Sequence, residues 1–221
     1  MSSLMSLDPD FYTKEIYSPR VPSVDLIEFE RHKSLGLLSQ LDQAILDRRT
    51  VASRWSPGEV FDHLIKFDNF FLENARQLVS LARDNRPTRL SFSLQELDVG
   101  PACIPKGMLP LFTVPSTIAS AVIPKPIQSV LAGSLPIKHP QFATPARSRP
   151  KLELQEDLEK TLSEYLQILG SPTQHDFSQM TISHPLLGNR NLLELPEFVA
   201  VHERRHFQRM TNLLNSPKHG E

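Results

Sequence analysis

Two histidines near the C-terminal end of the chain, His202 and His206, are four residues apart in the segment "HERRH". On an α-helix, residues four apart lie one above the other, so both imidazoles would project from one face. Phe198 and Met210 continue that face, which is therefore the apolar stripe expected to point into a protein core. Buried imidazoles need partners. A metal ion would supply one kind of partner, and carboxylates or water would supply the other.

The same five letters match the HExxH signature of zinc proteases, which need a third metal ligand downstream of the motif. In this chain Arg209 stands where the extended motif has glycine, and Asn212 stands where it has its third histidine. The remaining downstream candidates, His219 and Glu221, fall in a predicted loose tail. The sequence therefore argues against a protease and predicts that a third ligand comes from upstream.

His63 is the upstream candidate, because Val60, His63, Phe67 and Phe70 share one line on a predicted helix. Three other histidines before "HERRH" lie in predicted loops and are expected at the surface: His139, His175 and His184. His32 lies on the first predicted helix, next to Arg31. Three inward histidines on two helices predict a facial three-nitrogen site with open coordination positions, which is the arrangement of a catalytic metal.

The pocket walls are expected to come from the same helix faces. Phe67, Phe70 and Phe198 are the aromatic candidates, with Met210 further along, and plain core packing is the alternative role for each of them. Such walls suit a small, partly apolar substrate better than a peptide, which would need an extended groove.

No catalytic residue can be assigned beyond the candidate ligands. Glu203 and Asp62 each neighbour a candidate ligand, but the next residue on a helix points about 100° away. We expect Glu203 to face solvent or to pair with Arg204 or Arg205, and Asp62 to face solvent. The alternative is that either carboxylate orients a histidine ring from behind.

Four helices must position these residues, and periodic apolar positions predict them over residues about 23–49, 56–85, 151–169 and 191–214. The second has the clearest start: Ser56 can cap it, Pro57 takes the first helical position and Glu59 can complete a capping box. The fourth can start with a similar box between Asn191 and Glu194, or at Pro196. In the first helix, Arg31 and Ser34 interrupt the apolar stripe.

Proline separates the second predicted helix from the third. The chain has 19 prolines, and eleven of them lie between Pro87 and Pro150. Residues 86–150 should therefore form a long crossover without a long helix, and no strand is expected in the chain. The crossover carries too many apolar residues for a solvated loop, so it should cover the site or contribute to a dimer interface.

These patterns predict an all-α protein: one domain over residues 1–221, built as a four-helix bundle with a long proline-rich crossover between helices 2 and 3, and with loose tails at 1–15 and 215–221. A formal net charge of −1 gives no reason to expect nucleic acid or membrane as a partner. The single cysteine, Cys103, fits a reducing compartment, and no signal peptide is visible, so a cytoplasmic location is expected.

Two segments resemble the DinB/YfiT-like superfamily of metal-binding four-helix bundles: "WSPGEVFDHLIKFDNFFLENA" and "HPLLGNRNLLELPEFVAVHERRHFQRM". The shared features are the tryptophan–serine–proline opening at Trp55, the histidine that follows it, His63, and the HxxxH pair, His202 and His206. The resemblance implies a divalent metal, usually zinc or nickel, on these three histidines, and a homodimer.

Three functions follow from the residues and the resemblance together. The first is a metal-dependent enzyme, hydrolase-like, in which the metal activates water for attack on a small molecule. The second is a thiol-dependent S-transferase of the bacillithiol or mycothiol type, with a low-molecular-weight thiol as co-substrate. The third is a non-catalytic stress-response or binding protein with a structural or degenerate site.

Overall fold

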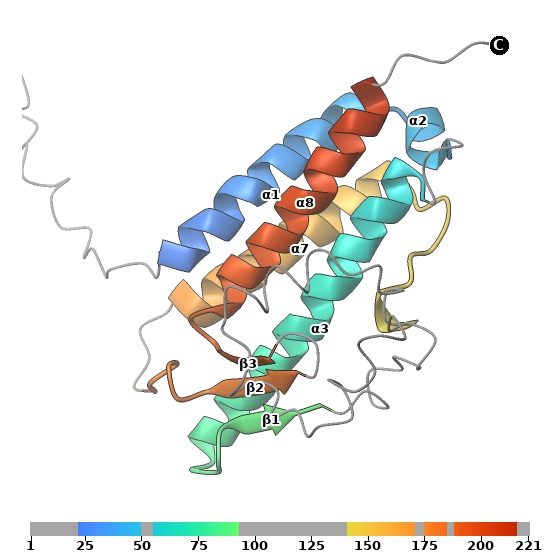
Figure 1. Ribbon diagram of the computed structural model, residues 1–221. Coiled ribbons are helices and arrows are strands. Elements are labelled where there is room, and N and C mark those ends of the chain that lie inside the picture. The colour runs from blue at the N-terminus through green and yellow to red at the C-terminus, as the bar shows by residue number, and fades with distance from the viewer. Residues whose placement is uncertain (1–21, 50–54, 93–140, 171–174, 185–187, 216–221) are drawn as a thin grey trace, which may run out of the picture.

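The computed structural model describes residues 22–49, 55–92, 141–170, 175–184 and 188–215, and it is mostly helical (Figure 1). Its four long helices are α1 (Pro22–Gln40), α3 (Pro57–Arg83), α7 (Lys151–Gly170) and α8 (Leu195–Asn215). They lie side by side: α1 contacts α7 and α8, and α3 contacts the same two helices. In the part of the chain that the structure describes, no helix is both long and apolar enough to span a membrane.

The first predicted helix, 23–49, is wrong as a continuous element, because α1 ends at Gln40 and a short helix, α2, follows at Gln43–Asp47. Asp42 causes the break: its backbone is extended, and its carboxylate accepts a hydrogen bond from the amide of Ile45 at 2.7 Å. A side chain that caps a new helix competes with continuation of the old one.

The start of α3 follows the predicted pattern. Ser56 accepts from the amide of Glu59, and the Glu59 carboxylate accepts from the amide of Ser56 at 2.8 Å, so both halves of the capping box are made. Burial alone would raise the pKa of Glu59, but hydrogen bonds from Arg49 and Ser56 lower it below its usual value. The helix ends at Arg83; two residues later Asn85 has a left-handed backbone, and the amide of Arg86 donates to the carbonyl oxygen of Leu81 in α3. These two ends fix the position of His63 along the molecule.

The expectation of no strands is wrong. β1 (Arg89–Ser91) pairs in parallel with β2 (Thr181–His184), and β2 pairs antiparallel with β3 (Gly188–Asn191), so the sheet order is β1-β2-β3. Strands of three or four residues are too short to show a period-two pattern in sequence. Leu90, which belongs to the predicted crossover, lies in β1, and most of that crossover lies outside the described residues.

The fourth helix begins at Leu195, after the reciprocal pair formed by Asn191 and Glu194. The amide of Glu194 donates to the Asn191 side chain at 3.0 Å, and the Glu194 carboxylate accepts from the amide of Asn191 at 3.2 Å. The backbone amides of Asn191 and Glu194 are thus hydrogen-bonded within this pair, and the helix starts after it. The start predicted at 191 is therefore four residues early.

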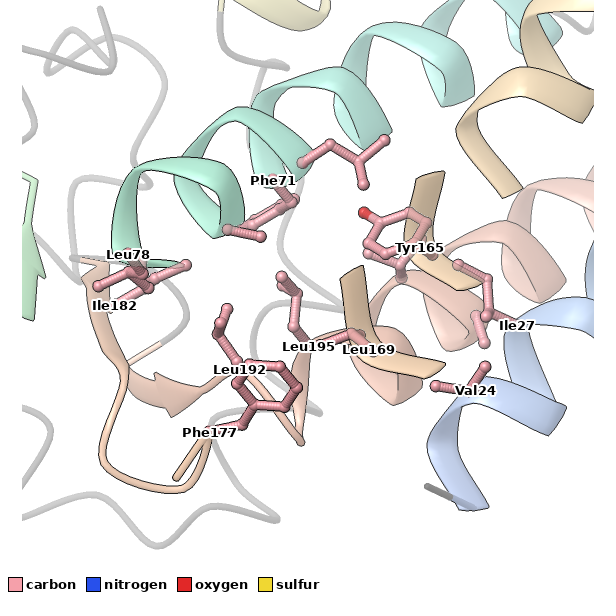
Figure 2. Packing of buried hydrophobic residues seen from close by; sticks show 14 of the residues in the cluster. Val24, Ile27, Phe71, Leu78, Tyr165, Leu169, Phe177, Ile182, Leu192 and Leu195 are labelled. Carbon is pink, nitrogen blue, oxygen red and sulfur yellow. The ribbon is translucent and has the colours of Figure 1, made fainter. Parts of the chain in front are cut away.

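The buried hydrophobic side chains form two clusters. The larger one joins α1, α3, α7 and the start of α8 to the sheet (Figure 2). Its labelled members are Val24, Ile27, Phe71, Leu78, Tyr165, Leu169, Phe177, Ile182, Leu192 and Leu195. The smaller one, around Leu38, Leu46, Phe61 and Leu158, packs α2 against α1, α3 and α7. Burying a leucine or phenylalanine side chain contributes about 1.5–3 kcal/mol, so both clusters hold the helices in place.

Candidate metal centre

His63, His202 and His206 lie together between α3 and α8. Each offers one ring nitrogen, and these three atoms lie within 4.8 Å of one another. The ring centroids are 5.2 Å apart for His63 and His202, 4.8 Å for His63 and His206, and 4.6 Å for the α8 pair. The structure therefore brings together the three residues that the sequence singled out as candidate ligands.

The helices account for this convergence. His202 and His206 are one turn apart on α8, which places their rings one above the other. His63 comes less than two turns after the Ser56 cap of α3 and is buried. Because α3 and α8 are in contact, the three rings meet at one place.

The segment 141–149 hydrogen-bonds to the His63 ring and orients it. The Nδ1 nitrogen of His63 donates to the carbonyl oxygen of Ala143 at 2.7 Å; Ala143 is the last residue of the 3₁₀ helix η4 (Gln141–Ala143). This bond assigns the ring proton to Nδ1, which leaves the Nε2 lone pair for a ligand. Lys66, one turn along α3, donates to the carbonyl oxygen of Thr144 at 2.7 Å.

His202 has a nitrogen without a partner. Its Nδ1 atom is buried and has no hydrogen-bond partner among the described residues. Burial, followed by the proximity of His206 and His63, lowers the pKa of His202 well below its usual value. The ring is therefore neutral near pH 7 and can donate a lone pair. A buried, unsatisfied imidazole nitrogen within a group of three histidines fits a metal ion, which binds neutral imidazole.

Aromatic rings flank the three histidines. Phe67 stacks on His202, with ring centroids 3.8 Å apart, and Phe198 lies 5.7 Å from Phe67. Trp55 contacts the other two histidines, at 4.8 Å from His63 and 6.5 Å from His206. Trp55 directly precedes the Ser56 cap, and this position brings its ring close to a histidine about two turns into α3.

The other two predicted pocket residues, Phe70 and Met210, pack against other hydrophobic side chains. Phe70 stacks on Phe142 at 4.3 Å and also contacts Phe92, so it joins α3 to the two described ends of the predicted crossover. Met210 is buried in the smaller hydrophobic cluster, around Leu38. These contacts match the core-packing alternative for both residues.

Both carboxylates that neighbour the histidines are buried, so the expectation that they face solvent is wrong. Asp62 accepts from the amide of Ala146 at 2.6 Å and from Arg149 at 2.9 Å, and it lies 3.0 Å from the ammonium of Lys66. It therefore anchors the segment that orients His63.

Glu203 pairs with neither Arg204 nor Arg205. Both of its oxygens accept from Arg31 of α1, at 3.0 and 3.1 Å from Nε, and the Glu203 side chain is only 1% exposed. Its neighbour Arg204 instead donates to Glu30 at 2.7 Å.

Arg31 is the centre of a buried polar cluster that joins all four long helices. It is 0% exposed, and besides Glu203 of α8 it donates to Asp68 of α3 and, in α7, to Thr161 Oγ1 and the carbonyl oxygen of Leu158, both at 2.6 Å. Burial raises the pKa of Asp68 to about 6; the positive charge of Arg31 opposes this effect and Glu203 adds to it. The predicted interruption of the α1 stripe is thus a buried ion cluster. The sequence carried one signal of this cluster: Arg31 stands four residues after Ile27, where the apolar stripe of the helix predicts a buried side chain.

The other histidines that the structure describes are not part of the three-histidine group. His32 is exposed on α1, with its Nδ1 donating to the carbonyl oxygen of Glu28 at 2.8 Å. His175 lies near the start of the segment that leads to β2, and His184 is the last residue of β2. His139 and His219 are outside the described residues.

A mostly helical chain with three histidines converging between two helices defines a class of candidate metal-binding proteins. The model of the DinB superfamily matches residues 26–210, which include all three histidines, the whole of α3 and α7, and most of α1 and α8. The chain belongs to the DinB superfamily. No curated protein and no solved structure gives a significant match to it.

Proposed function

We propose that His63, His202 and His206 bind one divalent metal ion, zinc or nickel, and that the protein is a metal-dependent enzyme acting on a small molecule. The observation that carries the proposal is the convergence of three ring nitrogens within 4.8 Å. The unpartnered Nδ1 of His202, its lowered pKa and the membership of the DinB superfamily support it.

The protein's own residues would prepare the ligands. Ala143 fixes the tautomer and the orientation of the His63 ring, and Phe67 restricts rotation of His202 by stacking on it. Three protein ligands leave coordination positions for water or substrate, as in catalytic zinc sites. When bound, the ion would lower the pKa of a water or thiol, or polarise a substrate oxygen.

The two carboxylates next to the ligands are engaged elsewhere, which limits the mechanism. Glu203 holds Arg31, and Asp62 holds the segment 146–149, so neither is placed as the general base of a zinc protease. We therefore propose hydrolase-like activation of water in which proton transfer does not use these residues. Activation of a small thiol, as in the S-transferase alternative, would need no general base from the protein, because a bound metal would lower the pKa of the thiol and its proton would pass to solvent water.

Metal content and cobalt binding test the proposal. Purified protein should contain zinc or nickel, and cobalt added to the metal-free protein should give the absorption spectrum of a site with nitrogen ligands. Alanine at His63, His202 or His206 should weaken cobalt binding by more than about 100-fold, since losing even an outer partner of a ligand costs about 10–100-fold. His32→Ala, which removes an exposed histidine of α1, is the matched control and should bind as the wild type does.

The open coordination positions need a separate test. Small thiols, carboxylates and hydroxamates should each perturb the cobalt spectrum if the ion has exchangeable positions. A response to thiols alone would favour the S-transferase. A spectrum that no added ligand changes would mean a closed structural metal and would contradict an enzyme. Absence of any metal binding would contradict the whole proposal.

The assembly also remains a proposal. We propose that the four long helices form a single four-helix bundle with a crossover between α3 and α7, and that two copies form the homodimer that is common in this family. Sedimentation velocity of the metal-loaded protein would test the dimer.

A further inference from the structure

Arg31 contacts the two helices that carry the candidate metal ligands. Its guanidinium donates from Nε and Nη2 to Glu203 of α8, and from Nη2 to Asp68 of α3 as well. Glu203 directly follows His202, and Asp68 comes five residues after His63. The guanidinium therefore links Asp68 of α3 to Glu203 of α8. Measured along its helix, each of these carboxylates lies within about 8 Å of a candidate ligand.

Among the hydrogen bonds of the described residues, those of Arg31 tie α3 to α8 next to the candidate ligands. The three histidine rings also pack against one another, and ring packing tolerates small shifts better than hydrogen bonds do. Arg31 also holds α7 through Thr161 and the Leu158 carbonyl, so its own position is fixed from a third side. The side chain is fully buried, so water does not compete for these hydrogen bonds.

We propose that Arg31 is a positioning residue for the metal centre. By holding Asp68 and Glu203 on one guanidinium, it fixes α8 against α3 and so sets the distance from His63 to the pair His202 and His206. This inference rests on the proposed metal binding. A metal ion tolerates shifts of only a few tenths of an ångström in its ligands, so a looser α3–α8 contact should weaken binding.

Two variants separate this geometric role from an effect of charge. Arg31→Lys keeps the positive charge but lacks the planar fork that reaches both carboxylates at once. Glu203→Gln changes the charge of the cluster but keeps a side-chain oxygen that can accept from Arg31 Nε. Leu78→Ala is the control for lost stability, because Leu78 is buried on α3 but lies about 22 Å along the helix from His63.

The measurement is the dissociation constant for Co²⁺, by competition with a chelator, alongside urea unfolding of the metal-free protein. We expect Arg31→Lys to weaken Co²⁺ binding by about tenfold or more. Glu203→Gln should stay closer to the wild type, and Leu78→Ala should lose stability while its affinity changes less than about twofold. Should Arg31→Lys fail to fold, Glu203→Ala takes its place, because it has the same charge as Glu203→Gln but no acceptor for Arg31.

Two other outcomes would contradict the inference, and each indicates a different role for the cluster. If Glu203→Gln loses more affinity than Arg31→Lys, the cluster acts through its charge. If both variants bind Co²⁺ like the wild type while losing stability, the cluster supports the fold alone. Either result leaves metal binding intact, whereas a wild-type protein that binds no Co²⁺ would overturn the proposed function itself.

Discussion

The Nδ1 nitrogen of His63 donates a hydrogen bond to the carbonyl oxygen of Ala143 over 2.7 Å, across 80 positions of sequence. A candidate ligand on α3 is thereby oriented by the backbone that leads into α7. Two residues that flank His63 on α3 also bind this stretch: Lys66 donates to the carbonyl oxygen of Thr144, and Asp62 accepts from the amide of Ala146. The orientation of His63 therefore depends on how firmly the segment 143–149 is held.

Asp62→Ala should weaken metal binding although Asp62 is no ligand. The change removes the acceptor for the Ala146 amide and for Arg149, so the Ala143 carbonyl is held less firmly behind His63. Loss of outer support of this kind costs about tenfold in affinity. The measurement is a Co²⁺ titration. Asp157→Ala is the matched control, because Asp157 also accepts from Arg149, at 2.7 Å, but does not bind the segment backbone. Equal losses in the two variants would contradict the prediction.

Two glycines on helices should respond to alanine in opposite ways. A Cβ at Gly58, in the first turn of α3, would lie 3.0 Å from the carbonyl oxygen of Leu46 in α2, whereas a Cβ at Gly36 of α1 would meet none of the described residues within 4 Å. Alanine gains about 1 kcal/mol over glycine in a helix, but overpacking costs about 1–3 kcal/mol. We expect Gly36→Ala to raise the free energy of unfolding by about 0.5–1 kcal/mol and Gly58→Ala to lower it by about 1 kcal/mol.

Urea unfolding of both variants checks this pair. A stabilised Gly58→Ala protein would show that α2 can move away from α3 at little cost. A destabilised Gly36→Ala protein would contradict the expected gain in helix propensity at an open position.

The sequence alone predicted the parts of this molecule that depend on local signals. The start of α3 was visible because Ser56, Pro57 and Glu59 act within one helical turn. The histidines were predictable because four-residue spacing on a helix requires a shared face, and His63 lay on an apolar line of its own. The resemblance to a known family pointed to the same three residues.

The parts that sequence could not supply depend on contacts between distant segments. Arg31 and Glu203 are 172 positions apart, and no local sequence pattern around either residue identifies the other as its partner. An arginine within an apolar stripe signals a buried pair, but not which carboxylates complete it. The strands were missed for the same reason: β1 pairs with β2 across about ninety residues, and neither is long enough to show alternation.

His202 should make the free energy of unfolding of the metal-free protein depend on pH. Its pKa is lowered in the folded protein, so below the unfolded-state value of about 6.5 the unfolded chain binds more protons than the folded one. The metal-free protein should therefore lose stability as the pH falls below about 6.5, relative to His202→Asn, which has no such group. Urea unfolding of both proteins at about pH 7.5 and about pH 5.5 measures the difference. A difference that does not change with pH would contradict the lowered pKa.

Trp55 is the only tryptophan in the chain, and its ring lies 4.8 Å from His63 and 6.5 Å from His206. Its fluorescence should therefore report on an ion at the three histidines. Co²⁺, whose partly filled d shell accepts excitation energy, should quench the emission and saturate at a single ion per chain. Zn²⁺, with its filled d shell, should quench less and should reverse the effect of Co²⁺ by competition. In His206→Ala, which keeps Trp55 and His63, the saturable quenching should disappear. Quenching that rises linearly with Co²⁺ and persists in His206→Ala would be collisional, and it would place the bound ion away from Trp55.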